Sequence, residues 1–283
     1  MPVCKSDDLN INYHVYGSGF PLILTHGFSG NLEVWTPQIE AFSKKYKLIV
    51  YDVRGHGLSS APAGAENYTL ELIVEDLHRL LNYLKIDKAY VGGLSMGGAA
   101  SMGYAGKHPE RVEALLIFDT DGGFQPPEPE SDALRRMMIE EDVKYAVERG
   151  MADLARRRIG NATAPRPVLN DEALQEWYIA RMARFPFNGF AGVQRAEPWR
   201  DSWLPTVADD IKVPTLIVVG GDDHLKQGAA ILHRQIKNSR YVEIEGSVHE
   251  TAVWRPDVFN PAVLEFLESV ENGNPLSGEI ILQ

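Results

Sequence analysis

Cysteines and long apolar runs are both scarce in this chain of 283 residues. The single cysteine, Cys4, cannot form a disulfide within the chain, which is typical of a reducing compartment. No segment approaches the roughly 18 consecutive apolar residues of a membrane-spanning helix. The opening MPVCKSDDLN also lacks the cationic start and apolar stretch of a secretion signal. We therefore expect a cytoplasmic protein that does not insert into a membrane.

Positive charge is also in short supply. The chain has 28 lysines and arginines against 39 aspartates and glutamates, a formal net charge of −11. This balance argues against binding to the phosphates of nucleic acids or to anionic membranes, and favours a small substrate. The content of 44% hydrophobic and 24% charged residues is that of an ordinary globular protein with a sizeable core.

The order of apolar runs predicts the fold class. From residue 11 to about 120, the runs INYHVYG, PLILTHG, YKLIVYD, KAYVGGLS and VEALLIFDT alternate with helical patterns. Such alternation predicts an α/β fold with a mostly parallel central sheet flanked by helices. One helix is expected over residues 70–85, with Thr69 as its N-cap. The glycines at 17 and 19 predict a hairpin turn.

This rhythm stops after about residue 121. DGGFQPPEPE at 121–130 is turn-rich, and residues 131–159 and 171–185 carry helical patterns without strand-like runs. Strand signals resume at PTLIVVGG and RYVEIEG, and a helical pattern follows at 257–270. We therefore predict a core domain of residues 1–123 and 208–283, with a helical cap inserted at 124–207. The final GNPLSGEIILQ is either a mobile tail or a segment that docks on the body or a neighbour.

The strongest local motif is GLSMG at residues 93–97. It follows a strand pattern and precedes a helix pattern, which is the context of a nucleophile elbow. Small flanking residues permit the tight, strained turn that holds a serine out at the top of a sheet. The start of the following helix adds positive potential there. We therefore predict that Ser95 is a catalytic nucleophile.

A second glycine-rich turn, HGFSG at residues 26–30, directly follows the PLILT strand. It predicts an oxyanion hole in which the backbone N–H groups of Phe28 and Met96 both point at the developing negative charge. Loss of one such donor typically costs about 3–4 kcal/mol of transition-state stabilisation. We expect His26 to shape this turn rather than to take part in the chemistry.

Two late strands end in an acid and a histidine. PTLIVVG leads into Asp222 and Asp223, and YVEIEG leads into His249. Because the carboxyl ends of parallel strands share one edge of a sheet, these groups can converge on Ser95. His249 would then act as the general base and an aspartate would orient it. The neighbouring His224 lies too close along the chain for typical closed metal sites, and we predict no metal.

Together these motifs resemble the α/β-hydrolase superfamily, and within it the branch of serine esterases, 3-oxoadipate enol-lactonases and haloperoxidase-like proteins. The resemblance covers nearly the whole chain and includes YDVRGHG at 51–57 with Ser59, and GSVHE at 246–250. It implies Asp223 as the acid, although some relatives take the acid from the earlier strand, where Asp119 and Asp121 stand here.

The resemblance also assigns structural roles, and it has one exception. Asp52 and Arg54 in the YDVRGHG loop are expected to form hydrogen bonds that brace the active-site edge. Relatives often carry a glutamate five residues after the catalytic histidine, where this chain has Trp254. This difference concerns the packing of the histidine loop and not the role of the histidine.

The predicted cap is rich in large apolar residues. We expect Trp177, Phe185, Phe187 and Phe190 to line an acyl or aromatic pocket, although most such residues would pack the cap onto the core. Three cations of the same region, Lys144, Arg181 and Arg184, are candidates for recognising a substrate carboxylate.

Several activities are compatible with these residues. A serine at position 95 argues against epoxide hydrolases and haloalkane dehalogenases, which resemble this chain but attack with an aspartate. Carboxylic-ester hydrolysis ranks first, followed by lactone opening, carbon–carbon bond hydrolysis and perhydrolysis. A ligand receptor on the same fold is the alternative outside enzymology. The predicted partner is a small-molecule ester or lactone, no cofactor is implied, and the oligomeric state stays open.

Overall fold

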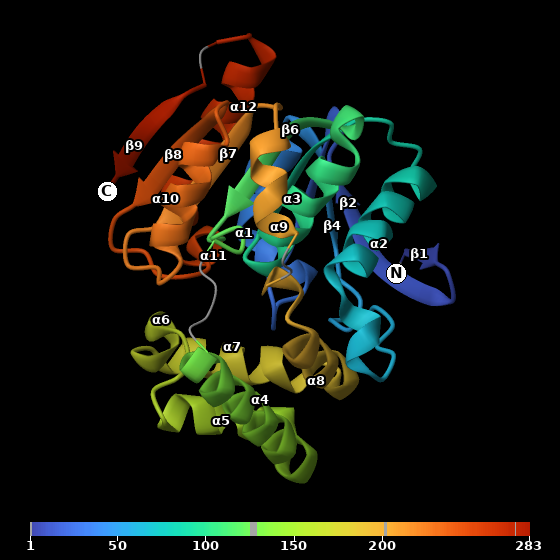
Figure 1. Cartoon of the computed structure of the whole chain (residues 1–283), viewed down its shortest axis with the longest axis vertical. Helices are drawn as coiled ribbons and strands as arrows, with labels where there is room; N and C mark the ends of the chain where they lie inside the picture. The colour runs from blue at the N-terminus through green and yellow to red at the C-terminus, as the bar shows by residue number, and fades with distance from the viewer. Residues whose placement is uncertain (1, 125–128, 201–202, 275) are drawn as a thin grey trace.

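The computed structural model describes residues 2–124, 129–200, 203–274 and 276–283. Its described strands form one sheet in the order β1-β2-β4-β3-β5-β6-β7-β8-β9 (Figure 1). Only β1 with β2 and β2 with β4 pair antiparallel, which confirms the predicted mostly parallel sheet. The bounds are β1 Val3–Ser6, β2 Leu9–Tyr16, β3 Phe20–Thr25, β4 Tyr46–Tyr51, β5 Ala89–Leu94, β6 Val112–Phe118, β7 Thr215–Gly220, β8 Ser239–Ile244 and β9 Gly278–Leu282.

The strand order corrects one expectation from the sequence and decides between the two alternatives for the C-terminal segment. The turn at Gly17 and Gly19 is not a hairpin, because β4 lies between the two strands that it joins, pairing antiparallel with β2 and parallel with β3. The C-terminal segment docks on the body, since β9 pairs parallel with β8, with Ile280 opposite Val242.

Helices cover both faces of the sheet because the strands bury side chains on both faces. Ile23 of β3 packs on the side of α2 (Leu70–Tyr83), α3 (Met96–Lys107) and α10 (Lys226–Gln235), whereas Leu22 packs on the side of α1 (Thr36–Ser43) and α12 (Pro256–Glu271). The predicted helix after Thr69 is α2, and the Thr69 hydroxyl accepts a hydrogen bond from the N–H of Leu72.

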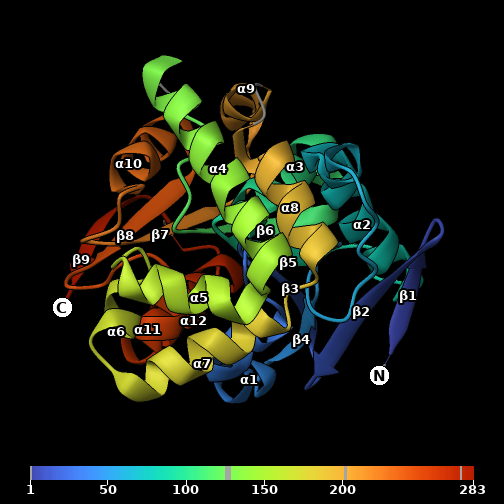
Figure 2. The same ribbon diagram turned by 90° about the horizontal axis from the view of Figure 1, so that it is seen from below.

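Five further helices form a layer below the sheet, seen side-on in Figure 1 and from below in Figure 2. We call α4 to α8 the helical layer; its bounds are α4 Pro129–Arg149, α5 Met151–Gly160, α6 Arg166–Leu169, α7 Glu172–Ala183 and α8 Phe187–Ala196. The layer has its own apolar core, which includes Leu154, Val168, Met182 and Phe190. The helical pattern at 131–159 is divided at Gly150, whose φ of +86° ends α4. Residues 125–128 of the turn-rich segment lie outside the described residues.

Short helices complete the fold. They are η1 Leu32–Trp35, η2 Ala65–Tyr68, η3 Pro109–Arg111, η4 Pro198–Arg200, α9 Leu204–Val207, η5 Ala208–Asp210 and α11 Thr251–Trp254. The chain leaves the helical layer through η4 and returns to the sheet through α9, which packs on α3. Within the described part of the chain, none of the helices is both long and apolar enough to cross a bilayer.

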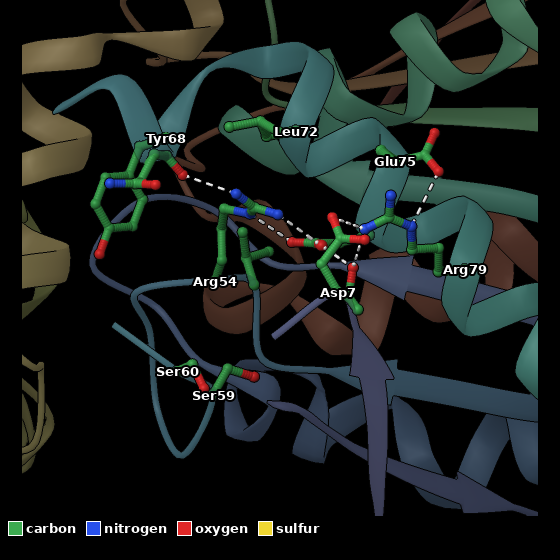
Figure 3. Close-up of polar contacts among 12 residues, drawn as sticks. Asp7, Arg54, Ser59, Ser60, Tyr68, Leu72, Glu75 and Arg79 are labelled. Carbon is green, nitrogen blue, oxygen red and sulfur yellow. Dashed lines mark hydrogen bonds and ion pairs between the residues drawn. The ribbon is translucent and has the colours of Figure 1, made fainter. Parts of the chain in front are cut away.

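The loop after β4 is braced as expected, but Asp52 and Arg54 use different partners. Asp52 accepts hydrogen bonds from Leu32 N–H and Leu58 N–H, at 2.7 and 2.9 Å. Arg54 forms a buried bidentate ion pair with Asp76 of α2, with N···O distances of 2.6 and 2.7 Å. Figure 3 shows Arg54 in this network, with Arg79 on its far side. These contacts hold the loop next to the carboxyl ends of the strands.

Candidate active site

Ser95 occupies a strained turn between β5 and α3. Its backbone has φ of 53° and ψ of −118°, a conformation that costs free energy for any residue with a side chain. Neighbouring glycines make room for this turn. A Cβ on Gly97 would lie 2.1 Å from the Thr25 carbonyl oxygen, and one on Gly93 would lie 2.2 Å from the Gly97 carbonyl oxygen. The GLSMG motif therefore requires glycine at both positions for steric reasons.

The two predicted oxyanion donors flank this turn. Met96 is the first residue of α3, so its N–H has no acceptor within the helix. Phe28 lies in the loop after β3, and its N–H has no hydrogen-bond partner among the described residues. A Cβ on Gly27 would lie 3.2 Å from the Cβ of Ser95, so this loop passes close beside the serine.

His26 is buried and neutral at the base of the same loop. Burial lowers the pKa of its imidazole to about 4, so Nδ1–H donates to the Gly27 carbonyl oxygen and Nε2 accepts from Val53 N–H. With both ring nitrogens engaged with backbone groups, His26 links the loops after β3 and β4. This arrangement supports its expected role in shaping the turn.

The structure brings His249 to Asp223. The Nδ1 atom of His249 lies 2.9 Å from Oδ2 of Asp223. Asp223 is held in place because its Oδ1 atom accepts a hydrogen bond from Leu225 N–H at 2.9 Å. Asp222 instead points outward, where it forms an exposed ion pair with Arg166. The geometry therefore favours Asp223 over Asp222 as the partner of the histidine.

The pair has shifted pKa values that match this contact. Burial by itself lowers the pKa of His249, but the hydrogen bond and the negative charge of Asp223 outweigh it and raise that pKa to about 9. Burial alone raises the pKa of Asp223, whereas the hydrogen bonds from His224 and His249 hold it well below its usual range. The positively charged imidazole is thus stabilised beside a carboxylate, as a general base needs after it accepts a proton.

Asp119, the alternative acid, has other partners. It is fully buried, and its carboxylate accepts hydrogen bonds from Gly220 N–H, Thr251 N–H and the Thr251 hydroxyl at 3.1, 2.7 and 2.7 Å. Burial raises the pKa of Asp119 to about 7. The side chain therefore ties the end of β6 to the loops that carry Asp223 and His249. Asp121, the other alternative, accepts a hydrogen bond from Gly123 N–H.

A second histidine shares the acid. His224 Nδ1 lies 3.1 Å from Oδ1 of Asp223, and its ring is 5.3 Å from that of His249 between centroids. The atoms with which Asp223, His224 and His249 could bind a metal ion lie within 4.8 Å of one another. The contacts of Asp223 with both rings account for the cluster without an ion.

A cavity of about 1070 Å³ joins these groups to the helical layer. Ser95 and His249 both line it from the carboxyl edge of the sheet. Side chains from the helical layer and from η4 line the opposite wall, and they include Arg135, Arg158, Tyr178, Arg181, Trp199 and Arg200. The size is suited to a small or medium organic molecule.

The four aromatic residues predicted to line this pocket do not line it. Phe185 and Phe190 pack on the ring of Phe28, at centroid distances of 5.6 and 6.1 Å, and Phe28 itself lines the cavity. Trp177 packs on Trp254, and Phe187 is 37% exposed at the start of α8. Helical periodicity indicates which apolar residues share a face of a helix. The rotation of each helix in the folded chain decides whether that face reaches the cavity.

The predicted cations are also distributed differently. Arg181 lines the cavity but is paired with Glu250, whereas Arg184 pairs with exposed Glu33 and Lys144 is exposed outside the cavity wall. Arg200, which the sequence analysis missed, lines the cavity instead. Its side chain has no hydrogen-bond or ion-pair partner in the part of the chain that the structure describes. No local sequence signal marks Arg200, since it lies in a short turn outside any helical pattern.

Known proteins are similar to this chain over most of its length. The alpha/beta hydrolase fold family matches residues 21–256, which contain Ser95, Asp223 and His249. A protein of Azorhizobium caulinodans named as a carbamate hydrolase is 28% identical, over 96% of this chain and 100% of its own length. Two solved structures each have a TM-score of 0.80 and cover 94% of this chain. An enol-lactonase from Burkholderia xenovorans LB400 is 28% identical and 100% covered, and a thermophilic esterase from Thermogutta terrifontis is 25% identical and 97% covered.

Proposed function

Because the chain belongs to the α/β-hydrolase family, we propose that it is a serine hydrolase that cleaves carboxylic esters of small or medium size. One observation carries the proposal. Ser95 and His249 line the same cavity, and the Nδ1 atom of His249 is held 2.9 Å from Asp223. A nucleophile, a base and an oriented acid from three separate loops are the groups that acyl transfer requires.

In the first half of the reaction, the Ser95 oxygen attacks the ester carbonyl. Because Asp223 holds Nδ1 of His249, the Nε2 atom accepts the serine proton. The N–H groups of Phe28 and Met96 stabilise the negative oxygen of the tetrahedral intermediate. The bond to the alcohol then breaks, and His249 returns its proton to the departing alkoxide.

In the second half, water hydrolyses the acyl-enzyme. His249 takes a proton from the water as it attacks the acyl carbon, and then gives that proton to the Ser95 oxygen as the carboxylic acid leaves. The aspartate keeps the imidazole in one orientation through both halves. No cofactor or metal takes part in these steps.

We further propose that the helical layer is the substrate-selecting cap of the enzyme, with the core formed by residues 1–123 and 208–283. This assignment is supported by the cavity, because one wall carries the reacting groups and the other carries side chains of α4, α5 and α7. The cap would shield the acyl-enzyme from bulk water and limit the size of the acyl group.

The test is hydrolysis of p-nitrophenyl esters of increasing acyl length by the wild type, Ser95→Ala and the control Ser29→Ala. We expect Ser95→Ala to lower kcat by about a thousandfold or more, because the nucleophile and base act as a unit. Ser29 also lines the cavity, but its loss should change kcat by less than about tenfold, within the range of ordinary positioning effects. Near-normal activity of Ser95→Ala would refute the proposal.

Lactone opening is the second candidate, and Arg200 favours it. An arginine that lines the cavity without a side-chain partner among the described residues suits a substrate carboxylate, as in an acidic lactone. Simple and carboxylate-bearing lactones should therefore be tested beside the esters, with Arg200→Gln. A rise in KM of about tenfold for the acidic lactones alone would support this candidate, since a charged hydrogen bond contributes about 1.5–3 kcal/mol.

Two remaining alternatives are separated by the same panel. A carbon–carbon bond hydrolase would leave esters and lactones untouched but cleave a diketone in a reaction that depends on Ser95. A ligand receptor would bind such compounds without turning them over.

A further inference from the structure

Trp254, the residue that departs from the family pattern, contacts the histidine loop directly. Its indole Nε1–H donates a hydrogen bond to the backbone carbonyl oxygen of His249, at 2.8 Å. The ring also packs edge-on against Trp177 of α7, with centroids 6.0 Å apart. Trp177 of the helical layer therefore packs against Trp254, and Trp254 in turn binds the backbone of His249.

A second contact joins the same helix to the same loop. Arg181 of α7 forms an ion pair with Glu250, the residue after His249, with an N···O distance of 3.2 Å. Both side chains are almost fully buried, with 4% and 10% of their surfaces exposed. The guanidinium also stacks on Trp177, at 4.5 Å from the ring centroid.

Together these contacts join α7 to the loop after His249 at two points. Trp177 and Arg181 are four residues apart on α7, so they lie on one face of the helix. Facing them, Trp254 and Glu250 belong to the loop and short helix that follow His249. Glu250 has a backbone φ of +70°, a left-handed conformation that needs support in a residue with a side chain.

We infer that α7 clamps the loop of the catalytic histidine, and that Arg181 and Trp177 are positioning residues that act through Glu250 and Trp254. This inference rests on the proposed function for the role of His249. It assigns to the helical layer a second task beside substrate selection, because the layer then helps to hold the base in its reactive position.

The clamp should affect the rate of chemistry more than substrate binding. Removal of Arg181 leaves the Glu250 carboxylate buried without its ion-pair partner, which favours movement of the loop. A displacement of about 1 Å in a catalytic group can lower a rate by about a hundredfold. Since Arg181 also lines the cavity, a direct role in substrate binding would instead appear in KM.

The main experiment compares Arg181→Met, Arg181→Lys and the control Arg184→Met on a neutral p-nitrophenyl ester. Arg184 lies at the end of the same helix and pairs with exposed Glu33, so its loss removes a similar charge without breaking the contact with Glu250. We expect Arg181→Met to lower kcat by about 30- to 100-fold with KM changed less than about threefold. Arg181→Lys should recover part of kcat, and Arg184→Met should match the wild type. Unchanged kcat with a raised KM would overturn the inference.

Amide hydrogen exchange gives a readout that does not depend on activity. Arg181→Met should speed exchange in residues 247–255, whereas Arg184→Met should not. Trp254→Phe keeps a packed ring but removes the donor to His249, so it should lower kcat by about three- to tenfold, the loss of one ordinary hydrogen bond. If Arg181→Met does not fold, Arg181→Lys and Trp254→Phe carry the same test.

The two proposals fail in different ways. Activity that persists in Ser95→Ala would refute the proposed hydrolase, while faster exchange of residues 247–255 in Arg181→Met would still establish the clamp. Ser95-dependent turnover combined with unchanged exchange and unchanged kcat in Arg181→Met and Trp254→Phe would refute the clamp alone.

Discussion

The carboxyl edge of the sheet and the helical layer next to it are held by different kinds of contact. At the edge, buried polar side chains bind backbone groups of neighbouring loops, as Asp119 does with Gly220 and Thr251. In the helical layer, many polar contacts join exposed side chains, such as Arg195 with Glu140. Buried hydrogen bonds to the backbone fix the positions of the loops, whereas exposed ion pairs contribute little to the stability of the fold.

Under the proposed function, this difference separates two tasks of the protein. The proposed reacting groups, Ser95, Asp223 and His249, need fixed geometry, and they lie beside buried carboxylates that bind backbone N–H groups of neighbouring loops. The cavity wall opposite them carries side chains of α4, α5 and α7, to which the proposed function assigns substrate selection. The Arg181–Glu250 pair is an exception, because it is a buried contact between the two regions.

The largest expected effect separates two carboxylates within the edge. Asp223→Asn should lower kcat by about 10⁴-fold, because an amide neither stabilises the imidazolium nor fixes the tautomer of His249. Asp119→Asn should lower thermal stability but keep kcat within about tenfold, since Asp119 binds loops rather than the imidazole. Steady-state kinetics and thermal unfolding measure the two effects. An equal loss of kcat in both variants would show that the two carboxylates share one role.

The next effect compares a buried ion pair of the edge with an exposed one of the helical layer. Arg54→Met leaves Asp76 buried without its partner and should lower the free energy of unfolding by about 3–5 kcal/mol. Arg184→Met removes an exposed pair with Glu33 and should cost less than about 1 kcal/mol. Urea unfolding compares the variants. Similar losses would contradict the contrast between the two regions.

The smallest predicted effect is the dependence of kcat/KM on pH, which follows from the contact of His249 with Asp223 at this edge. His249 must be neutral to accept a proton, and its pKa is raised to about 9. Activity, as kcat/KM, should therefore rise with pH up to about 9 and fall by about tenfold per unit below it, or about a hundredfold from pH 9 to pH 7. Asp223→Asn should move this rise to lower pH, whereas Arg184→Met should leave it in place.

Stability should follow pH in the opposite direction. The pKa of His249 is higher in the folded chain than its ordinary value of about 6.5. The stabilisation from its charged form is therefore fully present below about pH 6.5 and is lost as the pH rises toward 9. Thermal unfolding between pH 6 and pH 9 checks this sign. A pH profile of kcat/KM centred near 6.5 would contradict both statements.

The sequence by itself determined the local chemistry of the edge. The GLSMG turn needs glycine at 93 and 97 because a side chain there would collide with backbone, and this requirement is written in neighbouring residues. The N-cap of α2 at Thr69 and the alternation of strands with helices are local in the same sense. Short-range sterics and hydrogen bonds decide such features, so they are visible without a structure.

Only the tertiary structure decided which distant residues meet. Asp119 contacts Thr251 across 132 positions of sequence, and Arg181 contacts Glu250 across 69. The rotation of α7 turned Trp177 toward Trp254 instead of the cavity, and pairing with β8 placed the C-terminal strand. These outcomes depend on how whole helices and strands pack, because the same apolar pattern is compatible with several rotations and only the assembled core selects one.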